Sequence, residues 1–258
     1  MSGPPILAVV DLTNMVHTDW HAVNGHKSGE SRDVSQYALR RCRAMRDIWG
    51  AKVICAVDSP DSYRREKCDT YKAHRGPKPE SLTRQIAVSN HLVIKEFPVV
   101  DADGFEADDI LATLAFQGTR NGYRVVLVTR DKDANQCLMQ GEVTKCQRLG
   151  VNGKQIQAEW LTAAALREQY GFGPERWIDY QCLVGDATDN ITGCHGVGEE
   201  TAKWLLCRAT LEEWLEEPHR APKVSLRDSL TEFKSRYESV YDLVRLRIDV
   251  PGLEDCLL

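Results

Sequence analysis

The sequence contains no uninterrupted apolar run of about 18 residues, the length that a helix needs to cross a membrane. It also has no Cys-x-x-Cys pair, because its nine cysteines are scattered along the chain. This spacing argues against a zinc site or a disulfide framework and favours reduced thiols. The N-terminal segment MSGPPILAVVD lacks the basic head and long apolar stretch of a signal peptide. We therefore expect a cytoplasmic protein without a membrane partner.

The overall composition excludes little, since 42% apolar and 28% charged residues are ordinary for a globular protein. The net charge of −5 argues at first against a nucleic-acid partner. However, the segment from Tyr63 to Arg84 carries seven basic and three acidic residues, which reverses the local balance. A basic segment suits a phosphate backbone, although a solvated surface face would have the same composition.

Three apolar segments run directly into an aspartate, as a buried strand followed by a carboxylate would. They are ILAVVD, VICAVD and VVLVTRD, which end at Asp11, Asp58 and Asp131. Further acidic residues lie in TRDKD, GFEADD and GDATDN, and they are Asp133, Glu106, Asp108, Asp109, Asp186 and Asp189. Because ligands bind beyond the carboxyl ends of parallel strands, we expect these carboxylates to converge.

Converging carboxylates repel one another unless a cation lies between them. Oxygen ligands favour hard divalent ions such as Mg²⁺ or Mn²⁺, and a pair of such ions is a common device for cleaving phosphodiesters. Simpler interpretations exist for each group: residues 106–109 suit a helix start, and the acidic residues near 131 and 186 suit turns. The sequence as a whole favours a two-metal site.

Apolar periodicity predicts strands that alternate with helices over residues 1–150, which indicates an α/β domain with a mostly parallel central sheet. From residue 151 to 258 the pattern becomes helical, and a basic loop or arch is expected at about 60–85. Strands are predicted near 6–11, 52–57, 97–100, 123–129 and 143–149, and helices near 34–49, 80–95, 107–121, after Asp133, and at 158–170, 174–184, 199–208 and 226–245.

Two predicted helices flank a Gly-x-Gly turn formed by Gly196, Val197 and Gly198. Such a turn lets backbone amides approach a phosphate closely, and the next helix offers its N-terminus. We therefore predict a helix–hairpin–helix at about 180–208. An ordinary packing corner between two helices is the alternative.

Together these segments resemble the 5′-nuclease superfamily, which includes flap endonucleases, phage 5′-exonucleases and the N-terminal nuclease domain of bacterial DNA polymerase I. The similarity covers roughly residues 6–210, in the correct order. It is carried by DLTNMVHTDWHA, by VDSPDSYRREKCDTYKAHRGPKPE, by GFEADDILA, by TRDKDANQ and by LVGDATDNITGCHGVGEETA.

The resemblance implies a PIN-like core and two or more Mg²⁺ or Mn²⁺ ions. It assigns Asp11, Asp58, Glu106 and Asp108 mainly to one metal and Asp131, Asp133 and Asp189 mainly to the other, with Asp109 and Asp186 in the same cluster. It makes Lys72 and Arg75 the basic pair at the scissile phosphate. The expected DNA contacts are Tyr63, Arg64, Tyr71, Lys72, Arg75, Gly196, Val197 and Gly198, with a K⁺ ion at the hairpin.

The implied function is a stand-alone, monomeric structure-specific 5′ nuclease of DNA replication and repair, acting on 5′ flaps, nicked or gapped duplexes, or RNA primer–DNA hybrids. Thr192 and Glu200 depart from the proline and lysine usual in the family, which weakens the expected hairpin contact with phosphate. Two alternatives stay open. One is a non-catalytic protein that binds branched DNA, and the other is a PIN-type ribonuclease.

Overall fold

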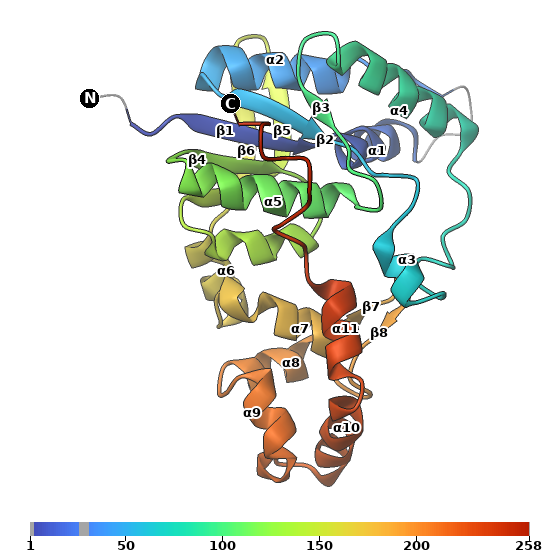
Figure 1. The fold of residues 1–258 in the computed structure, drawn as a ribbon, viewed down its shortest axis with the longest axis vertical. Coiled ribbons are helices and arrows are strands. Elements are labelled where there is room, and N and C mark those ends of the chain that lie inside the picture. The colour runs from blue at the N-terminus through green and yellow to red at the C-terminus, as the bar shows by residue number, and fades with distance from the viewer. Residues whose placement is uncertain (1–2, 26–30, 258) are drawn as a thin grey trace. The chain divides into compact units, whose positions relative to one another are not determined.

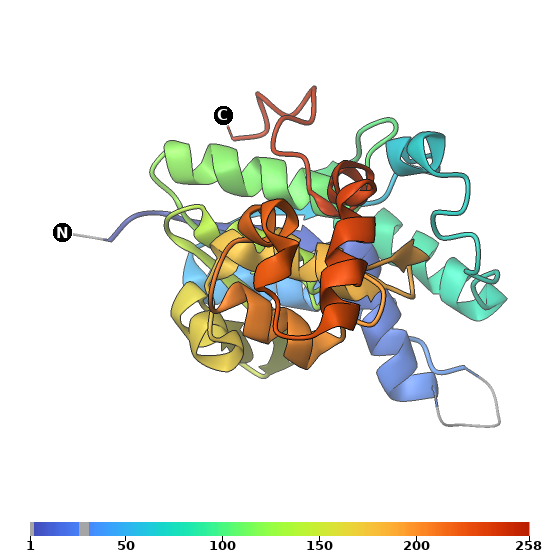
Figure 2. The same cartoon turned by 90° about the horizontal axis from the view of Figure 1, so that it is seen from below.

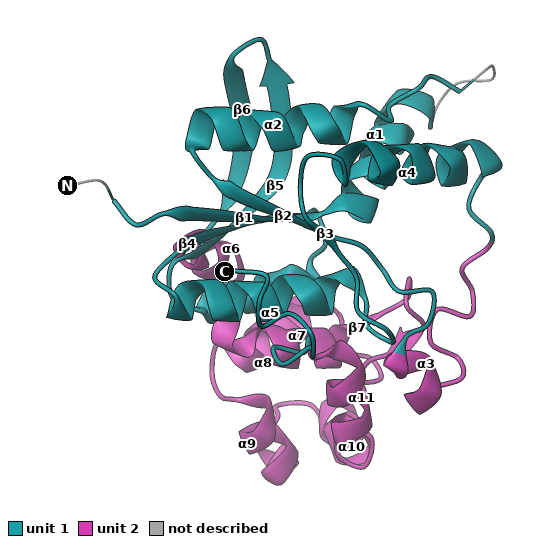
Figure 3. Ribbon diagram, turned by 45° about the horizontal axis from the view of Figure 1, so that its top comes forward, with its two compact units in different colours: residues 1–62, 77–162, 246–258 teal, residues 63–76, 163–245 magenta. Residues whose placement is uncertain are grey.

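The computed structural model describes residues 3–25 and 31–257. They form two compact units, shown in different colours in Figure 3. Unit 1 comprises residues 1–62, 77–162 and 246–258, and unit 2 comprises residues 63–76 and 163–245. Both units are thus assembled from separate stretches of chain, whereas the sequence pattern predicts a single domain boundary after residue 150.

A six-stranded sheet forms the centre of unit 1, with the strand order β3-β2-β1-β4-β5-β6. The strands pair in parallel except β6, which is antiparallel to β5. Their bounds are β1 Ile6–Asp11, β2 Lys52–Ala56, β3 Val99–Val100, β4 Arg124–Val128, β5 Val143–Asn152 and β6 Gln155–Leu161. The predicted α/β fold with a mostly parallel sheet is therefore confirmed.

The strand order reverses at β1, because the chain adds β2 and β3 on one side of β1 and β4 to β6 on the other. Helices from consecutive crossovers diverge at such a reversal, and this leaves room for a ligand beyond the carboxyl ends of the strands. Asp11 is the last residue of β1, and Asp131 follows β4 closely. The fold therefore brings acidic residues to the place where α/β proteins bind ligands.

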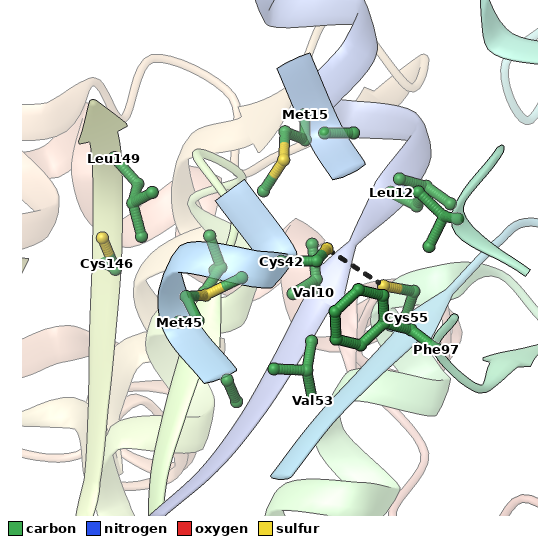
Figure 4. Close-up of a cluster of buried hydrophobic side chains, with 14 of the residues drawn as sticks. Val10, Leu12, Met15, Cys42, Met45, Val53, Cys55, Phe97, Cys146 and Leu149 are labelled. Carbon is green, nitrogen blue, oxygen red and sulfur yellow. Dashed lines mark hydrogen bonds between the residues drawn. The ribbon is translucent and has the colours of Figure 1, made fainter. Parts of the chain in front are cut away.

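Helices cover both faces of this sheet (Figures 1 and 3). On one face lie α1 (Leu12–Asn24), α2 (Tyr37–Trp49) and α4 (Glu80–Val93), and on the other lies α5 (Ala107–Arg120). The core beneath α1 and α2 includes Val10, Met45 and Phe97 (Figure 4). Cys42 and Cys55 also meet there, with 3.7 Å between their Sγ atoms, and all nine cysteines are free thiols.

Unit 2 is mainly helical, as predicted, with a small β7–β8 ladder between two of its helices. Its centre is aromatic: the Tyr170 ring lies 4.9 Å from that of Trp177 and 5.4 Å from that of Tyr180. The elements are α3 Tyr63–Lys67, α6 Ala163–Tyr170, η2 Pro174–Arg176, α7 Trp177–Val184, β7 Gly185–Asp186, β8 Ile191–Thr192, α8 Glu199–Leu206, α9 Leu211–Glu216, η3 Pro218–Arg220, α10 Val224–Lys234 and α11 Tyr237–Val244.

Two predicted elements are wrong in detail. The expected helix at 158–170 begins only at Ala163, because residues 155–161 alternate in exposure and pair with β5 as an edge strand. The expected helix at 226–245 is two helices, α10 and α11, interrupted at Ser235 and Arg236.

Helix α1 was not predicted; Asp11 caps it directly after β1. Short helix α3 lies within the segment that was expected to be irregular.

Residues 246–257 return to unit 1 and run beside α5 (Figures 1 and 2). The hydroxyl of Thr113 on α5 donates to the carbonyl of Arg247 and accepts the N–H of Val250, at 3.2 Å in both cases. Among the described residues, no helix has both the length and the apolar character needed to span a membrane.

The close approach of α5 to the sheet depends on Gly118. A Cβ at this position would lie 2.7 Å from Cδ2 of Leu7 and 2.9 Å from Cγ2 of Val125. We predict that Gly118→Val lowers the free energy of unfolding by about 1–3 kcal/mol, because overpacking forces the two layers apart. Chemical denaturation measures this effect. The control is Arg120→Ala, which alters an exposed side chain of the same helix; equal stability of the two variants would contradict the prediction.

Candidate active site

Asp11 occupies the end of β1 and is only 5% exposed. Its Oδ1 accepts the backbone N–H of Asn14 at 2.8 Å, which caps α1. Its Oδ2 accepts the hydroxyl of Thr129 at 3.4 Å, just beyond β4. The carboxylate therefore joins two neighbouring strand ends, and capping accounts for only one of its oxygens.

Asp58 follows β2 and connects that strand to the start of α5. Its Oδ1 accepts the N–H of Ala107 at 3.0 Å. Glu106 is the N-cap residue of α5, in an extended conformation, and Asp108 lies in the first helical turn. The acidic segment GFEADD thus begins its helix beside the carboxylate of Asp58, as convergence at the sheet edge requires.

Asp131 and Asp133 lie in the turn that follows β4. Oδ1 of Asp131 accepts the N–H of Asp133 at 3.0 Å, and the N–H of Asp131 donates to Oγ1 of Thr129 at 3.1 Å. Thr129 therefore contacts both Asp11 and Asp131. This shared hydroxyl places the turn against the end of β1.

The carboxylates are close enough to perturb one another strongly. Burial, then the charges of Asp58 and Asp131, raise the pKa of Asp11 from 3.8 to about 8. Burial, then the charges of Asp131, Asp11, Asp133 and Asp58, raise the pKa of Asp108 well above its usual value. Five carboxylates from four segments of unit 1 thus form one electrostatic group, which we call the acidic cluster: Asp11, Asp58, Asp108, Asp131 and Asp133.

The chemistry of the acidic cluster fits divalent metal ions. Oδ1 of Asp108 is buried and has no hydrogen-bond partner among the described residues. A buried carboxylate oxygen without a donor is costly, and a cation satisfies it. In this arrangement, no three His, Cys, Asp or Glu side chains of the described segments are gathered closely enough to hold a metal directly. The fit therefore rests on the oxygen donors and on the charge of the acidic cluster.

Lys145 was not predicted as a site residue. It lies on β5, is 1% exposed and donates from Nζ to the carbonyl of Asp131 and, at 2.7 Å, to Oδ1 of Asn135. Burial lowers its pKa to about 8, and the charges of Asp131, Asp108 and Asp133 oppose this shift. A fixed ammonium therefore stands beside the acidic cluster.

Asp109 has a different environment from its neighbour Asp108. It is fully buried, and its Oδ1 accepts the N–H of Arg247 at 2.9 Å, in the segment that runs beside α5. The same segment donates the N–H of Leu246 to Oε1 of Gln136, at 2.9 Å, three residues after Asp133. The C-terminal residues thus bind both α5 and the 3-10 helix that begins at Asp133. The hydrogen bond from Arg247 explains the burial of Asp109 without a metal.

In unit 2 the carboxylate of Asp189 is surrounded by the basic segment. Oδ1 of Asp189 pairs with Arg75, while Oδ2 accepts the Tyr71 hydroxyl at 3.2 Å and lies 3.7 Å from Nζ of Lys72. Oδ1 of Asp186 accepts the N–H of Thr188 at 2.7 Å and that of Asp189 at 3.3 Å. Asp186 therefore shapes the turn that presents Asp189 to Lys72 and Arg75.

Further hydrogen bonds, most of them to the backbone, connect the segment around Lys72 to the segment around Asp189. The N–H of Lys72 donates to the carbonyl of Asp189 at 2.9 Å, and Asn190 Nδ2 donates to the carbonyl of Thr70 at 2.9 Å. His74 Nε2 lies 2.6 Å from Oδ1 of Asn190. Lys72 and Asn190 both have positive φ, 55° and 59°, which non-glycine residues rarely adopt. Such strained backbone gathers at functional sites because the surrounding contacts must hold it.

Arg64 is placed differently from the expectation that it contacts DNA. Its side chain is 2% exposed, and Nε donates to the carbonyl of Leu243 at 2.8 Å while Nη2 donates to that of Arg245 at 3.1 Å. The guanidinium also lies 4.7 Å from the centre of the Tyr63 ring. Arg64 thus attaches α3 to the end of α11, so we leave Arg64 out of the proposed DNA contacts.

The turn between α7 and α8 has the local form of the predicted hairpin. Gly196 has a φ of 69°, Gly198 is the N-cap of α8, and the exposed glycines flank a buried Val197. At its base, Gly185 and Gly193 approach so closely that a Cβ on Gly193 would lie 2.5 Å from the backbone nitrogen of Gly185. Gly196 and Gly198 are therefore the exposed residues of the Gly-x-Gly turn, and Val197 is its buried one.

Sequence comparison decides the family. The family description "5′-3′ exonuclease, N-terminal resolvase-like domain" matches residues 6–171, and "5′-3′ exonuclease, C-terminal SAM fold" matches residues 172–256. The chain belongs to the 5′-3′ exonuclease family. This confirms the resemblance drawn from the acidic motifs.

Individual relatives agree with this membership of the 5′-3′ exonuclease family. A thermostable DNA polymerase I of Thermus thermophilus is 32% identical over 249 residues, which are 94% of this chain and 29% of the polymerase. The chain therefore spans less than a third of that relative.

Solved structures share the fold of this 5′-3′ exonuclease family member. Bacteriophage T5 5′-exonuclease with bound zinc has a TM-score of 0.73 and 19% identity, covering 96% of this chain and 90% of the phage protein. A bacteriophage T5 flap endonuclease in complex with DNA and metal ions has a TM-score of 0.72, 19% identity and the same coverage. These likenesses confirm the predicted PIN-like core and the helical C-terminal part.

The adjacent residues Asp108 and Asp109 should behave oppositely. We predict that Asp108→Asn lowers turnover about 100-fold or more, because it removes a charge from the acidic cluster. Asp109→Asn keeps an oxygen that accepts the Arg247 N–H and should retain most activity, whereas Asp109→Ala should lose about 1–3 kcal/mol of stability. Steady-state nuclease assays and denaturation curves measure these effects. Equal losses of turnover in both asparagine variants would contradict the assignment.

Raised carboxylate pKa values make stability depend on pH. The folded protein holds protons on Asp11 up to about pH 8, whereas the unfolded chain releases them near pH 4. Between pH 5 and 7.5 the metal-free protein should therefore lose stability as pH rises. Each 1 kcal/mol lost lowers the melting temperature by about 2–4 °C.

Calorimetry in EDTA and in Mg²⁺ measures this dependence. Mg²⁺ should raise the melting temperature more at pH 7.5 than at pH 5.5, because the ionised carboxylates bind it. Asp108→Asn should flatten the slope in EDTA. A metal-free protein whose melting temperature stays constant or rises across this window would contradict the assignment.

Proposed function

We propose that this chain is a metal-dependent 5′ nuclease that hydrolyses DNA phosphodiesters near junctions of single-stranded and duplex DNA. The observation that carries the proposal is the acidic cluster, where burial and mutual repulsion raise the pKa values of Asp11 and Asp108. A bound cation would stabilise the ionised form of these carboxylates. Family membership and the fold shared with metal-bound phage nucleases support the same activity.

The proposed ligands are the carboxylates of the acidic cluster together with Glu106, and the resident ions would be Mg²⁺ or Mn²⁺. Bound there, two such ions supply an activated water and neutralise charge on the attacking and leaving oxygens. The resemblance also assigns Asp186 and Asp189 to this ligand set, and we keep them as candidates. Asp109 is better explained by its bond to Arg247.

The chain's own cations would act on the substrate. Lys72 and Arg75 both pair with the carboxylate of Asp189 in unit 2, so their positive charges already lie close together. If a phosphate took the place of that carboxylate, the two side chains would stabilise the negative charge that develops in the transition state. Tyr71 is buried, and its hydroxyl donates to Asp189. We therefore propose that Tyr71 positions Asp189 beside Lys72 and Arg75 and does not stack on a base.

Duplex DNA would be held by the turn between α7 and α8. The exposed Gly196 and Gly198 leave backbone accessible to a phosphate, and a K⁺ ion bound by carbonyls would strengthen the contact. Glu199 and Glu200 occupy the first turn of α8, so a cation is more necessary here than in a lysine-bearing turn. We propose flapped, nicked and gapped duplexes as substrates and a monomer working in the cytoplasm, which the nine free thiols suit.

A labelled 5′-flap duplex tests the proposal. Mg²⁺ or Mn²⁺ should permit cleavage near the junction and EDTA should abolish it. Asp131→Asn should lower turnover about 100-fold or more while DNA binding, measured by fluorescence anisotropy in EDTA, stays within about threefold.

The matched control is Asp228→Asn, which neutralises an exposed carboxylate on α10 and should cleave normally. Intact DNA in every metal would show a binding protein instead of a nuclease. Faster cleavage of an RNA flap than of a DNA flap would favour a ribonuclease. Unchanged turnover of Asp131→Asn would remove the acidic cluster from the mechanism.

A further inference from the structure

Lys145 is among the largest fully buried side chains of the protein. Removing an ammonium from water is costly, so a buried lysine persists only where the structure compensates its charge. Three carboxylates do so electrostatically: Asp131, Asp108 and Asp133 favour the charged form of Lys145. Its Nζ donates to two oxygen acceptors in the interior, as a charged ammonium does.

The hydrogen bonds of Lys145 fix the position of this charge. Nζ donates to the backbone carbonyl of Asp131 and to the side-chain oxygen of Asn135. Both acceptors belong to the turn and 3-10 helix that follow β4 and carry Asp131 and Asp133. The ammonium is thus anchored to this segment through two neutral oxygens.

We propose that Lys145 is a positioning residue that acts as a permanent counter-charge within the acidic cluster, holding the Asp131–Asp133 turn in place and weakening the affinity of the site for divalent ions. The inference rests on the proposed function, because it assumes that metal ions bind beside these carboxylates. In the metal-free protein the ammonium offsets part of the repulsion among them. A bound divalent ion would be repelled by the ammonium, because both cations are attracted to the same carboxylates.

This competition makes a prediction that differs from those of other roles. Removing the charge should tighten metal binding, since the metal-free state loses more than the metal-bound state. If Lys145 only packed the core, both states would lose stability equally and the affinity would not change. If it only anchored the turn, its removal would weaken the site.

The experiment measures Mn²⁺ binding to the full chain by electron paramagnetic resonance, without substrate. We expect Lys145→Met to bind Mn²⁺ about tenfold more tightly than the unmodified protein. Lys145→Gln removes the charge but retains donors for the same oxygens, so it should show the same gain even if the methionine variant fails to fold. Lys145→Arg restores the charge and should bring the affinity back towards that of the unmodified protein.

Leu149→Ala is the matched control, because it removes a buried side chain of the same strand without altering charge. Its Mn²⁺ affinity should equal that of the unmodified protein. Equal or weaker binding by both uncharged variants of Lys145 would overturn the inference and leave the proposed function intact. Absence of Mn²⁺ binding by the unmodified protein would instead overturn the proposed function.

Discussion

Repulsion among carboxylates at the carboxyl edge of one sheet is the constraint on which the rest of unit 1 depends. Asp11, Asp58 and Asp131 follow three strands that hydrogen bonding keeps side by side, so their charges cannot separate without breaking the sheet. The apolar layers on both faces of the sheet supply the free energy that holds this arrangement. Burial, together with the charges of Asp58 and Asp131, raises the pKa of Asp11 above its usual value.

The chain reduces this cost by giving each of the three strand-end carboxylates a hydrogen bond from a backbone N–H. Asp11 caps α1, Asp58 accepts an N–H at the start of α5, and Asp131 closes its own turn. These bonds fix where the carboxylates lie, because each donor belongs to rigid backbone. They also explain why capping and metal binding are compatible interpretations of the same residue: a carboxylate has two oxygens, and only one is needed for a cap.

The sequence alone predicted the strand-end aspartates, because strand and carboxylate are adjacent in the chain and the geometry of a parallel sheet supplies the rest. It could not predict Lys145, which lies between Thr144 and Cys146 with no acidic neighbour and reaches Asp131 only through the pairing of β5 with β4. It could not separate Asp108 from Asp109 either, since that difference depends on Arg247, 138 residues further along the chain. The burial of Arg64 could not be predicted for the same reason, because it follows from contacts with residues beyond 240.

Asp189 in unit 2 shows the opposite solution to the same electrostatic problem. Two cations and a tyrosine hydroxyl surround this single carboxylate, so the chain itself offsets its charge. The acidic cluster has five carboxylates and one buried lysine, so the chain offsets its charge only in part. A phosphate reaching Lys72 and Arg75 would compete with Asp189 for these donors, because both side chains already pair with its carboxylate. The chain's own cations therefore compensate the charge of Asp189, whereas they leave the charge of the acidic cluster partly uncompensated at the place where we propose that metal ions bind.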